Sequence, residues 1–473
     1  MLFDVLEEKH NVSYTVNPVP LSDWNERLSV TLAAGDLPDY STDAHVGDET
    51  DFIAGGILLP ISKYVEHMPH FQARVAEWEG VEEQLDNIRY SDGEYYLLPG
   101  LRESPEMPFT LTYNKTIFEE HGLDVPQSWD ELRTVLEVLR DETGKTPMTL
   151  WWQGNSLLSF AGASFNARGG WGLGDGAFYD RENDEFVFGP MQEGYKEMIT
   201  YFAELTADGL LDVEALTQDD QAAQSKLANL DAFVSSGNVG TINMVNESME
   251  ELHGEGEYEF DRIPILEGPA GRRLTDSNFH NGIMLNANLA ERDDFLAILQ
   301  FLDWFHYSDE GSIFTNWGVE GVTFERTDEL PGGYKPLGNI SFEHFNVGAD
   351  ESLQKDYGFN NPGFAYGDPD DIALSIMSEE EYRAQSFMQQ EVEIVNPDPR
   401  YPMDPVEQEQ ATLLSTPLTD TVDQYTFRFI TGQASLDEWD TFMSELESQG
   451  ADEFIELVNE AYRKNQENLN NAK

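Results

Sequence analysis

Residues 113–132 read Tyr-Asn-Lys-Thr-Ile-Phe-Glu-Glu-His-Gly-Leu-Asp-Val-Pro-Gln-Ser-Trp-Asp-Glu-Leu, and this stretch decides the fold. The apolar alternation that begins at Phe109 predicts a strand that runs into a short helix. Gly122 predicts the end of that helix. Ser128 predicts the start of the next one, because Glu131 stands three residues after it in a capping-box pattern. A strand followed at once by two helices is typical of an α/β protein.

The same element order continues outward from this stretch. Residues 1–9 predict a helix, and helical patterns recur at about 191–208, 218–236 and 291–308 between short apolar runs. This alternation predicts mostly parallel sheets with helices on both faces. Residues 318–370, rich in Gly, Pro and aromatic residues, predict irregular chain with short helices. Because no Gly/Ser or Pro linker divides the sequence, we expect two lobes joined by several crossovers.

Composition excludes several classes of protein. The chain has 473 residues, 40% of them hydrophobic, which is enough for two or three domains with real cores. Its net charge of −63 disfavours nucleic acid and anionic membrane surfaces as partners, and indicates a solvated acidic surface suited to high salt. The absence of cysteine excludes disulfides, zinc–thiolate sites and Cys nucleophiles.

The first residues have neither the basic nor the apolar region of a signal peptide. Met1 opens directly on the pattern of an amphipathic helix. We therefore expect an export signal, a lipid-anchored Cys and a first strand to lie outside this sequence.

Signals for catalysis and metal binding are weak. The sequence contains no Gly-x-Ser-x-Gly, no His-Glu-x-x-His and no P-loop. The glycines of residues 170–176 predict a flexible loop. Acidic side chains alternate at Asp180, Glu182 and Asp184 as in a calcium loop, but the mid-loop Gly and the distal Glu are lacking. A solvated hairpin turn is therefore the favoured interpretation, with Ca²⁺ as the weaker alternative.

Two adjacent tryptophans, Trp151 and Trp152, follow an apolar run that predicts a buried strand. Because neighbouring strand residues point to opposite faces, one indole is expected to pack inward while the other projects into a cleft. Gln153 and Asn155 follow and have amides that could bond sugar hydroxyls, whereas the indoles offer flat apolar faces for stacking. Burial of both indoles in the core is the alternative.

Other candidate ligand-binding residues lie at strand ends or in polar loops. Trp317 and Glu320 share a glycine-flanked polar setting, which is compatible with either a cleft or the core. The remaining candidates near expected strand or helix ends are Trp24, Asp43, His45, Phe279 and His280.

Several segments resemble one known family. They are Ala34–Asp39, Asp92–Pro99, Asp208–Asp212, Gly237–Asn243 and Ile430–Asp440, and they flank the opening stretch in order and at plausible spacing. Together they resemble bacterial extracellular solute-binding proteins of family 1, which are maltose-binding-protein-like. The end of the chain is similar to the LipO/LplA-like lipoprotein branch of ABC sugar importers. In that family, the segment Gly237–Asn243 corresponds to a short strand.

The resemblance implies a two-lobed periplasmic-binding-protein fold of type II, with a doubly wound sheet in each lobe and hinge strands between them. One lobe would comprise residues 1–112 plus 278–325, and the other 113–277 plus 326–473. It also implies a monomeric carrier that captures an oligosaccharide in the cleft between the lobes and delivers it to permease subunits, without catalysis or cofactor. Such carriers are lipid-anchored on the extracellular face of the membrane or are periplasmic.

Carried over position by position, the resemblance assigns ligand binding to strand-end residues of both lobes. They are Asp43, His45, Trp151, Trp152, Gln153, Asn155, Asn243, Asn246, Phe279 and His280. Two other functions stay open: a binding protein for a non-sugar solute such as a peptide or cation, and a glycan-active enzyme with a carboxylate pair.

Overall fold

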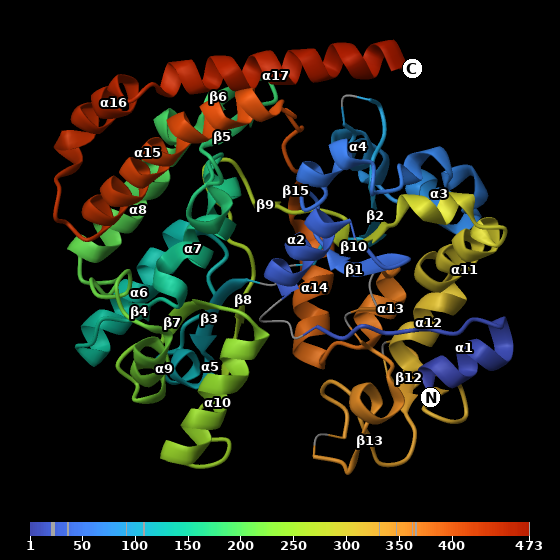
Figure 1. The fold of residues 1–473 in the computed structure, drawn as a ribbon. Helices are drawn as coiled ribbons and strands as arrows, with labels where there is room; N and C mark the ends of the chain where they lie inside the picture. Colours follow the sequence, from blue (N-terminus) through green and yellow to red (C-terminus); the bar gives the residue numbers. More distant parts are fainter. Residues whose placement is uncertain are drawn as a thin grey trace. The chain divides into compact units, whose positions relative to one another are not determined.

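The computed structural model describes residues 1–19, 24–35, 37–90, 92–106, 109–330, 332–346, 348–361, 363–364 and 367–472, and the chain divides into two compact units (Figure 1). Unit 1 comprises Met1–Pro105, Ser277–Tyr382 and Asn468–Lys473; unit 2 comprises Glu106–Asp276 and Arg383–Glu467. Each unit combines a central sheet with helices, which confirms the predicted two-lobed α/β class. No described helix combines the length and apolar character needed to cross a membrane.

Unit 1 is built on a three-stranded sheet in the order β1-β10-β2. Its strands are β1 (Tyr40–Ala44), β2 (Leu97–Leu101), β10 (Phe279–Leu285) and the short β11 (Phe324–Arg326), β12 (Tyr334–Pro336), β13 (Ile340–Ser341) and β14 (Glu351–Ser352). Its helices are α1 (Leu2–His10), α2 (Trp24–Ala34), α3 (Pro69–Glu77), α4 (Val81–Asn87), α11 (Phe295–Tyr307), α12 (Asp309–Trp317) and α13 (Asp370–Ser375), and α14 (Glu379–Glu391) begins in this unit. Leu98, Ile283 and Leu299 lie in the core between sheet and helices.

Unit 2 is built on a four-stranded sheet in the order β4-β7-β3-β8. Its strands are β3 (Thr110–Asn114), β4 (Met148–Thr149), β5 (Ala177–Asp180), β6 (Glu185–Phe188), β7 (Val234–Gly237), β8 (Phe260–Ile263), β9 (Arg273–Thr275) and β15 (Glu393–Val395). Its helices are α5 (Lys115–His121), α6 (Trp129–Thr143), α7 (Asn155–Gly162), α8 (Glu193–Ala207), α9 (Asp220–Ala228), α10 (Val239–His253), α15 (Pro405–Ile430), α16 (Trp439–Ser448) and α17 (Ala451–Ala472). The long α15 lies beside α8 (Figure 1).

The pairing of the strands differs from the predicted mostly parallel sheets. β10 runs antiparallel to both β1 and β2, and β3 runs antiparallel to both β7 and β8. In the two larger sheets only β4 and β7 pair in parallel. The prediction of mostly parallel pairs is therefore wrong. β3 and β10 are the strands that follow the first two passages of the chain between the units, and each runs antiparallel to both of its neighbours.

The opening stretch folds as its local signals predict. β3 leads into α5, whose N-cap Asn114 accepts a hydrogen bond from the backbone of Ile117 at 3.1 Å, and Gly122 ends the helix in a left-handed conformation. Ser128 then caps α6 by accepting the Glu131 N–H at 3.2 Å. The predicted strand–helix–helix order is thus confirmed.

Residues 326–382 group with unit 1, whereas the sequence-based division placed them in the second lobe. The physical reason is a separate apolar core that joins this segment to α1 and α12. Leu6, Phe305 and Trp317 pack there with Phe342 and Phe359. Because those contacts are distant in sequence, local patterns do not reveal them.

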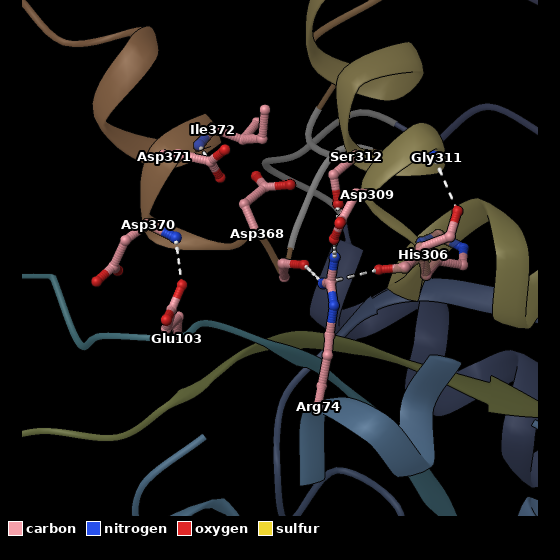
Figure 2. A network of polar contacts seen from close by, with 12 residues as sticks. Arg74, Glu103, His306, Asp309, Gly311, Ser312, Asp368, Asp370, Asp371 and Ile372 are labelled. Carbon is pink, nitrogen blue, oxygen red and sulfur yellow. Dashed lines mark hydrogen bonds and ion pairs between the residues drawn. The ribbon is translucent and has the colours of Figure 1, made fainter. Parts of the chain in front are cut away.

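A buried arginine organises the end of unit 1 where the chain leaves it (Figure 2). Arg74, which is 4% exposed, donates to the carbonyl of Gly367, to Ser312 Oγ at 3.0 Å and to the carbonyl of His306 at 3.5 Å. The segment after Gly367 in turn holds the chain beyond β2.

Two acidic residues complete that connection. Asp370 donates its backbone N–H to Glu103 Oε2 at 2.9 Å (Figure 2). Its carboxylate accepts from Ser104 Oγ at 2.8 Å. Residues 103–104, just before the unit boundary, are therefore fixed within unit 1 by charge-assisted hydrogen bonds.

Candidate functional site

Strand ends of unit 2 bring the main cluster of predicted site residues together. β4 and β7 are parallel, so their carboxyl ends lie at one edge of the sheet, and Thr110 at the start of β3 pairs with Gly237 at the end of β7. Residues 151–155 follow β4 at this edge. Ligands of open α/β sheets bind at such carboxyl edges.

The two adjacent tryptophans differ in burial, but they do not point to opposite faces of a strand. β4 ends at Thr149, Trp152 has a left-handed φ, and both indoles pack on the same cluster with ring centroids 6.0 Å apart. Trp151 is 2% exposed and packs in the core with Val245 and Phe260. Trp152 is half-buried. The alternative that both indoles lie in the core is therefore wrong for Trp152, and Trp151 has no surface to offer a ligand.

The backbone at this point is strained. Trp152 and Gln153 have φ values of 50° and 55°, a left-handed conformation that costs a non-glycine residue roughly 1–3 kcal/mol. The Trp152 N–H is held by Asp220 Oδ1 at 2.9 Å, and its carbonyl accepts from Asn155 Nδ2 at 3.1 Å. This strain presents Gln153 to solvent. Strained residues of this kind cluster at ligand-binding sites.

A third tryptophan, Trp171, completes an aromatic corner, which we define as Phe109, Trp152 and Trp171. The ring centroids are 5.3 Å apart for Phe109 and Trp152, 5.2 Å for Phe109 and Trp171, and 5.5 Å for Trp152 and Trp171. Sequence reasoning missed Trp171 because it lies in the glycine-rich segment that was expected to be flexible. Residues 170–172 form a helical turn. The available signal was a tryptophan with glycine on both sides.

Two other residues predicted to bind ligand, Asn243 and Asn246, lie on α10. Residues 239–243 are helical rather than a strand, because Asn238 caps α10 reciprocally with Thr241. Asn246 accepts the Phe260 N–H at 2.8 Å and so joins α10 to β8. Asn243 is exposed on the helix. Asn246 is thus a structural residue, and the predicted strand at 237–243 ends at Gly237.

Unit 1 has its own cluster at the end of β1. Asp43 has a left-handed φ of 57°, its carboxylate accepts from Asn281 Nδ2, and its carbonyl accepts from Trp24 Nε1 at 3.0 Å. Burial raises the pKa of Asp43 above its usual value, while His45 and Asn281 act in the opposite direction. Asn281, which is not among the predicted ligand-binding residues, therefore belongs to this cluster.

The other candidates of unit 1 flank this cluster. His45 is exposed, and its N–H donates to Asp48 Oδ2 at 2.8 Å. Phe279 is half-buried at the start of β10 and packs against the core of unit 1. The side chain of His280 lies outside the described residues.

Trp317 and Glu320 do not form part of either strand edge. Trp317 is fully buried, donates to Ser375 Oγ at 2.8 Å and stacks on Tyr334 with ring centroids 5.5 Å apart. Glu320 is exposed beside Arg326 at 3.5 Å. Ligand contact by Trp317 is therefore wrong, because aromatic rings of its own core cover the indole.

The acidic hairpin between β5 and β6 is satisfied by protein donors. Asp180 accepts from Asn183 Nδ2 at 2.7 Å, and Asp184 accepts from the hydroxyls of Tyr179 and Tyr462 at 2.5 and 2.7 Å. The hydrogen bonds hold the pKa of both carboxyls below the usual value. Among the described residues no group of three His, Asp or Glu side chains could hold a metal ion. The geometry thus favours the solvated turn over the calcium site with Glu182.

The fold agrees with the comparison to known families. A model of the bacterial extracellular solute-binding protein family matches residues 2–305. The chain belongs to this family.

Curated relatives of this solute-binding protein come from Streptococcus pneumoniae and Bacillus subtilis. It is 22% identical to the fructooligosaccharide ABC transporter substrate-binding protein FusA of Streptococcus pneumoniae serotype 4 (strain ATCC BAA-334 / TIGR4), over 95% of this chain and 84% of FusA. It is 22% identical to lipoprotein LipO of Bacillus subtilis (strain 168), over 68% of this chain. The match spans 64% of LipO, less than two thirds of its length.

A solved structure supports the same fold. The HMO-binding ABC-transporter-associated solute-binding protein from Bifidobacterium longum infantis ATCC 15697 superposes with a TM-score of 0.67, at 18% identity, over 98% of this chain and 94% of that one. At this identity the likeness concerns the fold alone.

Proposed function

We propose that this protein is the substrate-binding component of an ABC importer and that it captures an oligosaccharide. The observation that carries the proposal is the half-buried Trp152 beside the exposed Gln153 at the carboxyl edge of the unit 2 sheet. An indole supplies a flat apolar face for a sugar ring, and an amide supplies both a donor and an acceptor for hydroxyls. The fructooligosaccharide named for FusA is consistent with this chemistry.

The rest of the transport cycle follows from the proposed role. The protein would carry its ligand to permease subunits, act as a monomer without catalysis, and work on the outer face of the membrane under a lipid anchor or in the periplasm. Its acidic surface would suit a salt-rich medium. The expected location of the ligand between the two lobes stays a prediction.

The function is tested by titrating neutral oligosaccharides, beginning with kestose and nystose, in a calorimeter and by following thermal stabilisation. We expect a dissociation constant in the micromolar range or tighter, about −8 kcal/mol. Trp152→Ala should weaken binding at least tenfold. Leu252→Ala, at an exposed position of α10, is the matched control and should bind as the wild type does.

Two outcomes would contradict the proposal. Absence of binding across neutral and acidic oligosaccharides would exclude the sugar carrier. Release of shorter products on incubation with a glycan would show that the protein is an enzyme.

A further inference from the structure

The turn that contains Trp171 is built to hold its indole in place. Gly170 has a φ of +53°, and a Cβ at this position would lie 2.0 Å from the carbonyl oxygen of Asn155. A Cβ on Gly172 would lie 3.2 Å from Ser159 Oγ. The turn therefore packs its backbone directly on α7, at a distance that only glycine permits. This close packing places Trp171 against Trp152 and Phe109.

Trp171 is nevertheless open to solvent. Its exposed fraction is 51%, one of the largest among the apolar side chains of the described chain, although it contacts two other rings. Its indole is tilted by 50° to that of Trp152, and Phe109 meets Trp152 edge-on at 89°. An indole that is fixed on one side and exposed on the other is a preorganised stacking surface, because little side-chain entropy is lost on binding.

Acidic side chains lie next to the aromatic corner in contact or in sequence. Asp220 bonds the backbone of Trp152, and Asp175 lies four residues after Trp171 and accepts from Tyr401 at 2.8 Å. Arg168, three residues before Trp171, is already paired with Asp398 at 2.9 Å. No Lys or Arg of the described chain stacks on the three rings of the corner. With a net charge of −63, the field of the whole protein also repels a carboxylated sugar.

We propose that Trp171 and Trp152 form a stacking subsite for an uncharged sugar residue, and that this subsite selects neutral oligosaccharides over uronate-containing ones. The inference rests on the proposed function. It adds to it the charge class of the ligand and a specificity-determining residue, Trp171, in the turn of residues 170–172. Gln153 supplies the neutral hydrogen-bonding group beside the rings.

The test compares two substitutions and two classes of probe in the full chain. Trp171→Ala should weaken the binding of kestose or nystose about tenfold or more, whereas Trp171→Phe keeps a ring and should stay within about threefold of the wild type. Tetragalacturonate, which has the same number of sugar residues as nystose, should bind at least about a hundredfold more weakly than nystose. Leu252→Ala again serves as the surface control.

A direct readout accompanies the affinities. Ligand should shift the tryptophan fluorescence of the wild type and protect it from acrylamide, and Trp171→Ala should lose most of that protection. Equal affinity of Trp171→Ala and wild type would overturn the subsite, and tighter binding of tetragalacturonate would overturn its charge class. Both results differ from failure of the proposed function, in which the wild type binds no oligosaccharide at all.

Discussion

His306 shows how one buried side chain couples stability to pH. It is 2% exposed at the end of α11, and burial together with the nearby charge of Arg74 lowers its pKa from 6.5 to about 3. The unfolded chain therefore takes up a proton on His306 as the pH falls below 6.5, while the folded chain does not until near pH 3. Stability from the neutral imidazole is complete above pH 6.5 and is lost progressively on acidification. The expected slope is about 1.4 kcal/mol per pH unit.

Replacing His306 by Phe removes this titration and keeps a ring of similar size. Denaturant unfolding of wild type and His306→Phe at pH 7.5, 6 and 5 should show the difference in free energy of unfolding shifting in favour of the variant, by about 2 kcal/mol between pH 7.5 and 5. Burial raises the pKa of Asp303 and Asp370, which gives the opposite pH dependence, but these groups are common to both proteins and cancel in the difference. Parallel pH profiles would contradict the assignment.

Single residues also mark the limit of sequence reasoning about the site. The different burial of Trp151 and Trp152 was expected from the alternation of a strand, but that reason is wrong, because β4 ends at Thr149 and Trp152 has a left-handed backbone. The burial of Trp317 was not, since its polar, glycine-rich neighbours in sequence are not its neighbours in space, where Tyr334 and Phe342 cover it. Trp171 was missed for the converse reason: dense glycine was interpreted as flexibility, whereas here it permits close packing.

At the scale of elements, the turn of residues 170–172 makes a prediction of its own. Gly170→Ala puts a methyl group 2.0 Å from the Asn155 carbonyl in a left-handed conformation, so the turn must move away from α7. Although the indole itself remains, sugar binding should weaken nearly as much as in Trp171→Ala, with a loss of stability of about 1–3 kcal/mol.

The matched control is Gly174→Ala in the same loop, where φ is similar at +60° but no atom lies within 4 Å of the added Cβ. Gly174→Ala has the strained left-handed backbone but no steric overlap of the added Cβ. Its oligosaccharide affinity should therefore stay close to that of the wild type. Titration calorimetry of the two variants separates the effects. Unchanged affinity in Gly170→Ala would show that the turn does not position Trp171.

Elements differed in how well the sequence predicted them. β3, α5 and α6 were predictable because two side-chain N-caps and a left-handed glycine act within four residues. The antiparallel insertion of β3 and β10 was not, because strand direction depends on how the chain passes between the units. The membership of residues 326–382 in unit 1 was likewise decided by a core assembled from distant segments.

For the whole molecule the dominant quantity is charge. The chain has 90 acidic and 27 basic residues, so even one-to-one pairing would leave 63 carboxylates without a cation. Many basic groups are already engaged: Arg133 pairs with Glu204 at 2.8 Å, and Arg292 with Asp294 at 2.8 Å. These pairs are exposed and contribute little each, so repulsion among the remaining carboxylates opposes the compact state.

Screening should therefore stabilise the protein. The Debye length falls from about 10 Å at 0.1 M salt to about 3 Å at 1 M, which is shorter than most separations between surface charges. We expect the melting temperature to rise by at least about 3 °C between 0.1 and 1 M NaCl at pH 7.5. KCl and choline chloride at equal ionic strength should act alike, because screening depends on charge rather than on the identity of the ion. A rise with NaCl alone would instead indicate a specific cation site, and a flat or falling melting temperature would show that repulsion does not limit this fold.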